Sequence, residues 1–382
     1  MNCPIPGATS YCDPEGTGSN GVLILGEACG ESEAKDHLPF RPYAPAGSVL
    51  ERAIRRCGYN REQFVVFNVC PVQPPKNFLE GAAWETEAIE WGKEILTGLV
   101  QKYKPRSILA LGNIPLRATT GLSGDKLSVS TLRGWPVPSL SNFMNVPVVA
   151  TFHPSFLRRG AMGLFSVLMH DLKLSVAVAN SKIGQTVKFF SPVLSRDVVY
   201  TRGPLPDLFN PVVPAGYTTH PLESQAWEFL KDAEDDPRRF IAYDIETPRS
   251  SEVSENESDE LEESHILSIQ FSLAPRSGMF CPWREPFVEI SKRILSLPNP
   301  KVGANVWRFD NPRLVQAGCR LNGDVHDVRW AFHHLNPDLR GALQFIASFY
   351  NSGDGFPWKQ LSHSHKSEYG ILDVDWCQRI WG

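Results

Sequence analysis

Residues 21–30 read GVLILGEACG, an apolar run that is followed directly by a glycine-rich turn. An apolar run of this length, bounded by glycine, is typical of a buried strand. Helix-like and strand-like segments then alternate as far as residue 180. This alternation predicts an α/β fold with a parallel sheet covered by helices on both faces. We expect strands over 63–71, 106–112 and 146–155, and helices over 48–58, 84–105 and 165–180.

The chain has 382 residues, which is more than a single hydrophobic core usually serves, so we expect two domains. Hydrophobic residues make up 42% and charged residues 21%, values that are ordinary for a globular protein. The net charge of −4 gives no global argument for nucleic-acid binding. Any such function must therefore rest on local sites.

The cysteines and the N-terminus bear on the compartment. The first residues, MNCPIPGATSYCDPEG, lack the basic and apolar regions of a signal peptide, and no apolar run approaches 18 residues. The eight cysteines are scattered and form no C-x-x-C pair. We therefore expect reduced thiols, no membrane association and a cytoplasmic protein.

Polar and aromatic residues follow the strands of the first half. Gly26 and Gly30 permit a tight turn with exposed amides, and Phe40 is an aromatic that can stack on a base. Asn68 ends a strand, and its amide can pair with an imide edge as both donor and acceptor. His153 follows another strand. Because function in parallel sheets gathers at the carboxyl ends of the strands, these residues are expected on one rim.

Four ordered segments of the first half resemble the uracil-DNA glycosylase superfamily, in particular its family 4-like branch. They are GEACG (26–30), PF (39–40), NVCPVQPP (68–75) and HPSFL (153–157), and RGWPVP (133–138) resembles a further family segment. The resemblance covers about residues 20–180. It implies excision of uracil from DNA by hydrolysis of the N-glycosidic bond, after the base is flipped out of the stack.

The resemblance also implies roles for individual residues. Phe40 would stack on uracil and Asn68 would read its amide edge, with Gly26 and Ala28 completing the pocket. Glu27 would position water and stabilise the sugar cation, while His153 and loop amides would stabilise the uracil anion. The remaining expected contacts are those of Leu157, Arg158 and Arg159, which would wedge into the duplex and hold phosphates.

The sequence also departs from this family. Family 4 enzymes hold an iron–sulfur cluster on four cysteines, but Val72 stands at one of these positions and the helix at 84–103 has no cysteine. Cys3 and Cys12 are the N-terminal candidates, and Cys70 is displaced by two residues, so we predict no cluster. The stretch after PF is also two residues longer than usual. A domain that binds uracil-containing DNA without cleaving it is therefore an alternative.

The second half opens with a proline-rich stretch, which we interpret as a connector over 186–221. A helix over 222–236 and a strand over 240–247 follow. Side chains alternate along a strand, so Asp244 and Glu246 of FIAYDIETPRS (240–250) should share one face. Two adjacent like charges repel, and a divalent cation would remove this conflict. The acidic stretch 250–264 is expected to be a solvated loop.

Two later segments supply further carboxylates. Asp310 ends NVWRFD (305–310), and Tyr369 and Asp373 lie four residues apart, on one face of a predicted helix. Carboxylate oxygens suit hard cations such as Mg²⁺. Two ions about 3.5–4 Å apart can clamp the attacking and leaving oxygens of a phosphodiester, and Tyr369 could orient the attacking water.

The segments DIET, NVWRFD and YGILD resemble the three motifs of the DEDDy-type 3′–5′ exonucleases, a superfamily that includes the proofreading domains of family A DNA polymerases. The resemblance covers about residues 222–382 and implies an α/β, RNase H-like fold. It implies that Asp244, Glu246, Asp310 and Asp373 hold two Mg²⁺ or Mn²⁺ ions, and that Tyr369 assists. Thr247 and Asn305 would lie near the DNA. A relative of this fold with an inactive site is the alternative.

Together these observations predict a bifunctional DNA-processing enzyme. We expect a glycosylase-like domain at 1–185, a connector at 186–221 and an exonuclease-like domain at 222–382. The expected partner is uracil-containing DNA, single- or double-stranded, and a DNA polymerase is a further candidate. The pairing of domains suggests a bacterial or phage-infected cell. Two alternatives stay open, namely a uracil-sensing module that recruits the exonuclease, and the front part of a phage replication polymerase.

Overall fold

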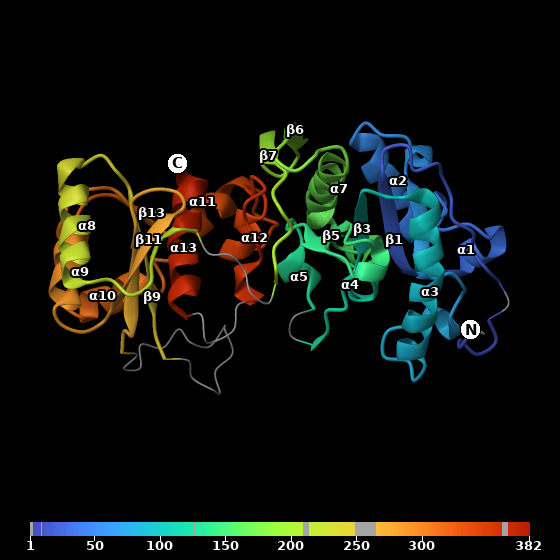
Figure 1. Ribbon diagram of the computed structural model, residues 1–382, viewed down its shortest axis with the longest axis horizontal. Coiled ribbons are helices and arrows are strands. Elements are labelled where there is room, and N and C mark those ends of the chain that lie inside the picture. Colours follow the sequence, from blue (N-terminus) through green and yellow to red (C-terminus); the bar gives the residue numbers. More distant parts are fainter. Residues whose placement is uncertain (1–2, 9, 125–126, 209–213, 249–264, 361–365) are drawn as a thin grey trace. The chain divides into compact units, whose positions relative to one another are not determined.

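The computed structural model describes residues 3–8, 10–124, 127–208, 214–248, 265–360 and 366–382. The chain divides into two compact units (Figure 1). The first unit comprises Met1–Pro211 with Asn351–Pro357, and the second comprises Val212–Tyr350 with Trp358–Gly382. The expected acidic loop at 250–264 lies outside the described residues.

The first unit is built on a five-stranded sheet with the order β2-β1-β3-β5-β4. Neighbouring strands are parallel except β4, which runs antiparallel to β5. The sheet therefore has the predicted parallel character, and the carboxyl ends of β1, β2, β3 and β5 lie on one edge. The strands are β1 (Val22–Ala28), β2 (Val65–Cys70), β3 (Ser107–Leu111), β4 (Val137–Pro138) and β5 (Pro147–Thr151).

Helices flank both faces of this sheet (Figure 1). Helices α3 and α4 pack together and contact β1 and β2, whereas α2 and α7 pack together and α7 contacts β3 and β5. Most of the buried strand residues are aliphatic or aromatic, so both faces form core, and the buried polar exceptions are Asn68, Ser107 and Thr151. The helices are α1 (Glu31–Asp36), α2 (Pro45–Arg56), α3 (Glu85–Tyr103), α4 (Asn113–Thr120), α5 (Val129–Leu132), α6 (Pro154–Arg158) and α7 (Phe165–Ala179), with 3₁₀ turns at Arg61–Gln63, Pro75–Asn77, Ser141–Phe143 and Met162–Leu164.

Helix α7 packs against β1, β3 and β5, and most of its residues are buried. Asp171 forms an ion pair of 2.6 Å with Arg133, and both side chains are completely buried. The segment Met162–Ala179 is long and apolar enough to cross a membrane by length and composition, but 72% of it is buried inside the protein. Such burial is typical of the core helix of a globular domain.

The predicted connector contains regular structure. Strands β6 (Thr186–Ser191) and β7 (Arg196–Thr201) form an antiparallel hairpin. Ser191 on β6 hydrogen-bonds His170 of α7 at 2.8 Å, so the hairpin is tied to the core of the first unit. Alternating exposed and half-buried residues along β6 match a strand with one covered face. The high proline content of residues 186–221 led us to expect a connector without strands in this region.

The second unit is built on a six-stranded sheet with the order β13-β12-β9-β10-β11-β8. Strands β9, β10 and β11 are mutually antiparallel, β12 and β13 run parallel to β9, and β8 runs parallel to β11. The strands are β8 (Gly216–Thr218), β9 (Ile241–Glu246), β10 (Ser268–Ser272), β11 (Ser277–Pro282), β12 (Lys301–Gly303) and β13 (Val325–Asp327).

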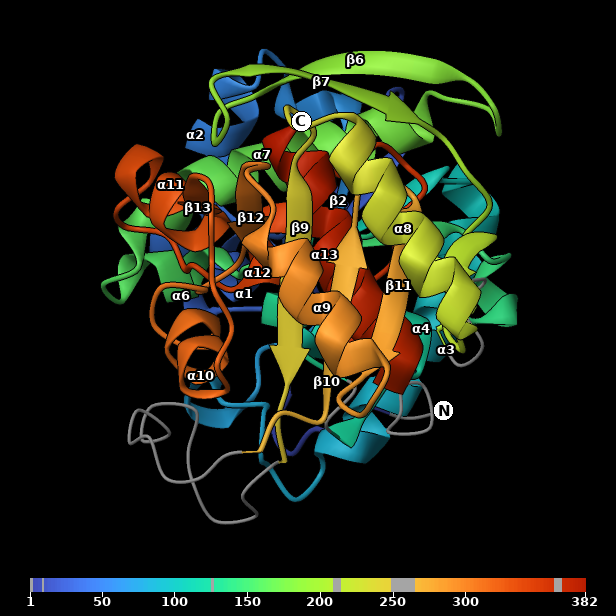
Figure 2. The ribbon, with the colours of Figure 1, turned by 90° about the vertical axis from the view of Figure 1, so that its left-hand side faces the viewer.

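The two faces of β9 meet different helices. Ile241, Tyr243 and Ile245 belong to the hydrophobic core with α8 and α9. The alternate residue Asp244 pairs with Gln270 of β10, whose side chain contacts Gly370 of α13 on the other face. Figure 2 shows α8 and α9 in front of the sheet and α13 behind it. The helices are α8 (Glu223–Asp235), α9 (Phe287–Ser296), α10 (Asp310–Gln316), α11 (Val328–Leu335), α12 (Leu343–Ala347) and α13 (Lys366–Trp381), with a 3₁₀ turn at Trp358–Gln360.

Candidate functional site

The carboxyl ends of β1 and β2 bring three predicted site residues together. Gly26 lies directly opposite Asn68 in the parallel pair. A Cβ atom on Gly26 would lie 2.2 Å from Asn68 Oδ1 and 2.4 Å from the Phe40 ring, so any larger residue would separate these side chains. The rings of Phe40 and His153 are 5.8 Å apart. An aromatic face, an amide and an imidazole therefore converge at this rim.

Asn68 is 1% exposed, and its Oδ1 atom has no hydrogen-bond partner among the described residues. Its Nδ2 atom lies 3.5 Å from Glu33 Oε1. An unsatisfied buried acceptor costs about 1–3 kcal/mol, so it is uncommon unless a ligand completes it. The pocket thus offers a free acceptor beside Phe40.

Glu27 is half-buried at the end of β1. Burial raises the pKa of its carboxyl to about 7, with further contributions from Glu80 and Glu85 and an opposing one from Arg159. Ala28 follows it and lies opposite Cys70 of β2. Glu27 therefore exchanges a proton near neutral pH, which suits a group that acts on water.

His153 precedes α6 and caps it. Its Nδ1 atom accepts a hydrogen bond of 3.2 Å from the Ser155 amide, so the neutral ring carries its proton on Nε2. Burial, and to a lesser degree Arg159, lowers the pKa of His153 to about 4. At neutral pH the ring is an uncharged hydrogen-bond donor.

Helix α6 corrects one expectation. Leu157 was expected to wedge into DNA, but its side chain is completely buried. Its neighbour Phe156 is 38% exposed and stacks on Phe152, and Arg158 and Arg159 are exposed as expected. The phase of a short helix depends on what it packs against, and in α6 the leucine faces the core.

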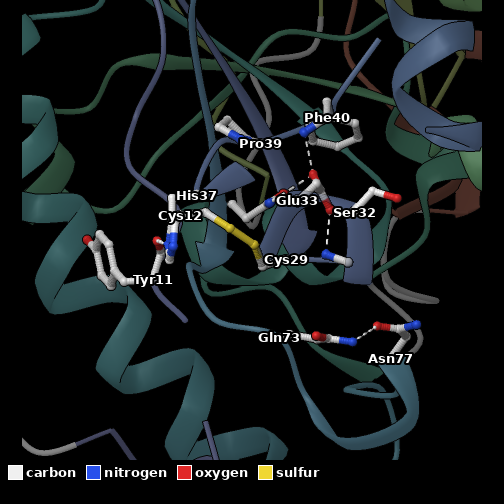
Figure 3. The surroundings of a disulfide bond; sticks show 12 residues. Tyr11, Cys12, Cys29, Ser32, Glu33, His37, Pro39, Phe40, Gln73 and Asn77 are labelled. Carbon is white, nitrogen blue, oxygen red and sulfur yellow. Dashed lines mark hydrogen bonds between the residues drawn. A yellow bond between two sulfur atoms is a disulfide. The ribbon is translucent and has the colours of Figure 1, made fainter. Parts of the chain in front are cut away.

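Glu33 belongs to this site but was not identified from the sequence. Its carboxylate accepts a hydrogen bond from the amide of Phe40 (Figure 3). It also accepts hydrogen bonds from the amide of Gly30 and from Asn68 Nδ2. The spacing of Gly30 and Glu33 matches a helix N-terminus, where the third residue commonly bonds back to the cap. The contacts to Phe40 and Asn68 are tertiary, and no local pattern predicts them.

Two cysteines of the pocket region are joined. Cys12 and Cys29 form a disulfide beside Glu33 (Figure 3), and both are 1% exposed. The expectation that all cysteines are reduced is therefore wrong for this pair. The bond connects the pocket turn to residues 11–15, where Tyr11 pairs with Val72 and Glu15 with Val66.

The described cysteines do not fit a four-cysteine cluster. Val72 is 5% exposed and lies two residues after the end of β2, and α3 contributes no cysteine. Cys70 is buried, lies 3.5 Å from the Ala88 carbonyl, and has its pKa raised to about 12, mainly by burial. Cys12 and Cys29 are bonded to each other. The absence of a cluster nonetheless stays a prediction, and no step below depends on one.

The second unit gathers carboxylates on the α13 face of its sheet. Oxygen atoms of Asp244 and Glu246 on β9 and of Asp373 on α13 all lie within 4.8 Å of one another. Burial raises the pKa of Asp244 well above its usual range, and Asp310, Asp373 and Glu246 raise it further. Strand alternation accounts for Asp244 and Glu246 sharing one face of β9, and the packing of α13 against the sheet brings Asp373 to them.

Asp310 is 2% exposed at the start of α10, and its Oδ1 atom accepts a 2.9 Å hydrogen bond from the Ile245 amide. Burial raises its pKa to about 7, although the Ile245 amide opposes the shift. This bond ties Asp310 to the backbone of the residue that follows Asp244 on β9, and the charge of Asp310 also raises the pKa of Asp244. The fourth carboxylate thus belongs to the same neighbourhood.

Two further residues of this neighbourhood were not predicted. Trp358 Nε1 donates to Asp373 Oδ1 at 2.7 Å, and Lys359 Nζ contacts Asp373 Oδ2 at 3.1 Å. Lys359 Nζ also hydrogen-bonds the Tyr369 hydroxyl and lies 4.2 Å from the centre of its ring. No spacing rule connects the Trp358–Lys359 segment with α13, because residues 361–365 intervene.

The two remaining predicted contacts are less direct. Thr247 is half-buried immediately after β9. Asn305 has its backbone amide bonded to Asp327 at 3.0 Å and its side-chain oxygen bonded to Arg329 at 3.0 Å. Asn305 therefore has a structural role in the turn before α10.

Comparisons with known proteins concern the first unit. The Uracil DNA glycosylase superfamily matches residues 14–173. The chain is 30% identical over 173 residues to a type-4 uracil-DNA glycosylase of Thermotoga maritima, covering 84% of that protein and 45% of this chain. It is 31% identical over 162 residues to the type-4 enzyme of Pyrobaculum aerophilum, covering 78% of that protein and 41% of this chain.

The matched residues contain the whole pocket built from Glu27, Phe40, Asn68 and His153. The parallel sheet, the pocket at its carboxyl edge and the extent of these matches lead to one conclusion. Through residues 14–173, the chain belongs to the uracil-DNA glycosylase superfamily.

Proposed function

We propose that the first unit removes uracil from DNA by hydrolysing the N-glycosidic bond. The observation that carries this proposal is the convergence of Phe40, Asn68 and His153 around Gly26, beside the titratable carboxyl of Glu27. The relatives from Thermotoga maritima and Pyrobaculum aerophilum are uracil-DNA glycosylases by name.

Recognition starts with a flipped base. Extruding a nucleotide costs a few kcal/mol, which stacking on Phe40 and hydrogen bonding to Asn68 offset. The N3–H group of uracil donates to Asn68 Oδ1, the buried acceptor that has no partner among the described residues. Arg158 and Arg159 are exposed on the neighbouring helix and contact the DNA phosphates.

Cleavage separates charge, because positive charge develops on the sugar and negative charge on uracil. His153 donates a hydrogen bond from Nε2 to the uracil anion, which a neutral imidazole can do. The Glu27 carboxylate stabilises the sugar cation and takes the proton of the water that attacks C1′. The products are uracil and an abasic site.

A single-stranded oligonucleotide with a 5′ label and one internal uracil tests this proposal in EDTA. The wild-type protein should produce an alkali-labile break at the uracil, and Glu27→Gln should abolish it. Glu90→Gln is the matched control, because Glu90 is an exposed carboxylate paired with Lys93 on α3. Tight binding of uracil-containing DNA without an abasic product would favour the uracil-sensing alternative.

We propose as a second function that the second unit removes nucleotides from DNA 3′ ends. Two observations support it. Asp244, Glu246 and Asp373 converge within 4.8 Å, with Asp310 nearby. Five of the six strands of the sheet follow the order β11-β10-β9-β12-β13, in which β9, β10 and β11 are antiparallel and β12 and β13 run parallel to β9, as expected for an RNase H-like fold. The sixth strand, β8, pairs with β11.

The carboxylates of this site would hold Mg²⁺ or Mn²⁺, which supplies charge stabilisation to the attacking and leaving oxygens when bound. Tyr369 lies on α13, one turn before Asp373, and would orient the attacking water. Lys359, held between Tyr369 and Asp373, offsets part of the negative charge of the cluster. Hydrolysis yields a nucleoside monophosphate and a shortened 3′ end.

The same oligonucleotide without uracil tests this function when Mg²⁺ or Mn²⁺ is added. A ladder of shortened products is expected from the wild-type protein and from Asp232→Asn, an exposed carboxylate on α8 that serves as the control. Asp244→Ala should give no ladder. An oligonucleotide that stays intact with the wild-type protein both in Mg²⁺ and in Mn²⁺ would overturn the proposal. A polymerase partner stays a prediction.

A further inference from the structure

Glu33 connects three segments of the base pocket. One oxygen of its carboxylate accepts a hydrogen bond from the Gly30 amide. The other accepts hydrogen bonds from Asn68 Nδ2 and from the Phe40 amide, and Figure 3 shows Glu33 beside Phe40. These donors belong to the turn after β1, the aromatic segment and the end of β2. Burial raises the pKa of Glu33, whereas the bonds from Phe40, Gly30 and Asn68 lower it. The Glu33 carboxylate therefore links these three segments of the pocket through its hydrogen bonds.

The chemistry of this carboxylate decides how the Asn68 amide is turned. A carboxylate can only accept hydrogen bonds, so it selects the NH₂ group of Asn68 and excludes its oxygen. The oxygen is therefore left facing Gly26, where it has no partner among the described residues. Without Glu33, nothing in this contact would distinguish the two orientations of the amide.

We propose that Glu33 is a positioning residue that fixes the orientation of the Asn68 amide and thereby makes the pocket select uracil over cytosine. This inference rests on the proposed glycosylase function. Uracil presents an N3–H donor and an O4 acceptor, which match Asn68 Oδ1 and the second hydrogen of Nδ2. Cytosine presents an N3 acceptor and an N4 amino donor, the reverse pattern. An Asn68 amide held in this orientation can therefore form both hydrogen bonds with uracil, whereas with cytosine it would place donor against donor and acceptor against acceptor.

Glu33 also holds the stacking residue. Phe40 has a φ of 43°, in the left-handed region that non-glycine residues seldom adopt. Its carbonyl oxygen would lie 2.5 Å from a Cβ on Gly47, so the start of α2 packs tightly against this backbone. The bond from the Phe40 amide to Glu33 stabilises this conformation, and it places the Phe40 ring beside Asn68 and Gly26.

The test compares Glu33→Gln and Glu33→Ala with Glu31→Gln. Glu31 lies on the same helix, but its side chain is 65% exposed and pairs with Lys35. Glutamine keeps the size of Glu33 but has one acceptor oxygen, so it cannot serve both the Gly30 amide and the Phe40–Asn68 pair. Melting temperatures equal to that of Glu31→Gln identify the folded variants.

Two readouts are measured for each variant. The first is single-turnover release of uracil and of cytosine from matched oligonucleotides in EDTA. The second is inhibition by free uracil and by free cytosine, which reports base recognition without bond cleavage. We expect Glu33→Ala to lower the preference for uracil over cytosine at least about tenfold in both readouts, while Glu31→Gln retains it. A loss of tenfold corresponds to about 1.4 kcal/mol.

Different failures have different meanings. A wild-type protein that releases no uracil would overturn the proposed glycosylase function. A wild-type protein that releases uracil, with folded Glu33 variants whose preference stays within about twofold of that of Glu31→Gln, would overturn the role of Glu33 alone. An equal loss of uracil and cytosine recognition would also overturn it, because a purely structural defect weakens both.

Discussion

Glu27 is the residue whose protonation should govern uracil release. Its pKa is raised to about 7, chiefly by burial, whereas the pKa of His153 is lowered to about 4. The proposed chemistry needs Glu27 ionised and His153 neutral. Above pH 5 the imidazole is already neutral, so the carboxyl of Glu27 is the group that limits the rate around neutral pH.

We therefore predict that the single-turnover rate of uracil release rises between pH 6 and pH 8 and then levels, with an apparent pKa of about 7. Each unit below this pKa should lower the rate about tenfold, because only the ionised fraction acts. The measurement is a pH series in EDTA with the 5′-labelled oligonucleotide. A profile that is level from pH 5 to pH 8 would contradict the role given to Glu27.

At the residue scale, the sequence predicted which side chains belong to the base pocket better than it predicted the contacts that hold them there. Phe40, Asn68 and His153 were placed by resemblance, and the structure brings them together. Glu33 was missed because its bonds to Phe40 and Asn68 span 7 and 35 residues. Leu157 was misplaced because the sequence of a five-residue helix does not say which side faces the core.

At the scale of elements, the Cys12–Cys29 disulfide fastens the segment before β1 to the turn after it. The bonded cysteines are 17 residues apart, and closing a loop of this size stabilises a fold by about 3 kcal/mol. We predict that the double variant Cys12→Ala/Cys29→Ala has faster hydrogen exchange at the most protected amides of β1, which exchange only when the whole first unit unfolds. The measurement is hydrogen-exchange mass spectrometry.

The reductant provides the control for this prediction. Dithiothreitol should bring the wild-type protein to the exchange rates of the double variant and leave the double variant unchanged. Cys3→Ser, which changes an exposed free cysteine, should behave as the wild-type protein. Equal exchange in the wild-type protein with and without reductant would show that the bond does not stabilise the first unit.

The carboxylate cluster between β9, α10 and α13 gives a second prediction at this scale. A cation that binds only the folded protein stabilises it by about 2.7 kcal/mol at 100 times its Kd. Mg²⁺ should therefore raise the melting temperature of the wild-type protein and of Asp232→Asn. Asp244→Asn should lose this increase, because it removes a central ligand without changing its size. A calorimetric scan with and without Mg²⁺ measures the shift, and equal shifts in all three proteins would contradict the site.

The sequence predicted the main elements because their patterns are local. The apolar runs of β1, β2, β3, β5 and β9 and the amphipathic α2, α3 and α8 lie where their periodicity indicated. The hairpin β6–β7 was missed because one of its faces is exposed and proline surrounds it. The segment that brings Trp358 and Lys359 to Asp373 has no periodicity, so only tertiary packing places it.

At the scale of the whole molecule, each unit has a sheet, a core and a candidate site of its own. The base pocket uses no metal ligand among its described residues, and the carboxylate cluster lies on the second sheet. The proposed activities should therefore be separable. Changes in one site should leave the other active, since no step in either mechanism uses a residue of the other unit.

The measurement that tests this account most directly uses one 5′-labelled single-stranded oligonucleotide with an internal uracil. It is incubated with the wild-type protein, Glu27→Gln and Asp244→Ala, first in EDTA and then in Mg²⁺. We predict alkali-labile cleavage in EDTA by the wild-type protein and Asp244→Ala, and a metal-dependent ladder from the wild-type protein and Glu27→Gln. An oligonucleotide that stays intact in EDTA and alkali with the wild-type protein would contradict the central claim that this pocket excises uracil.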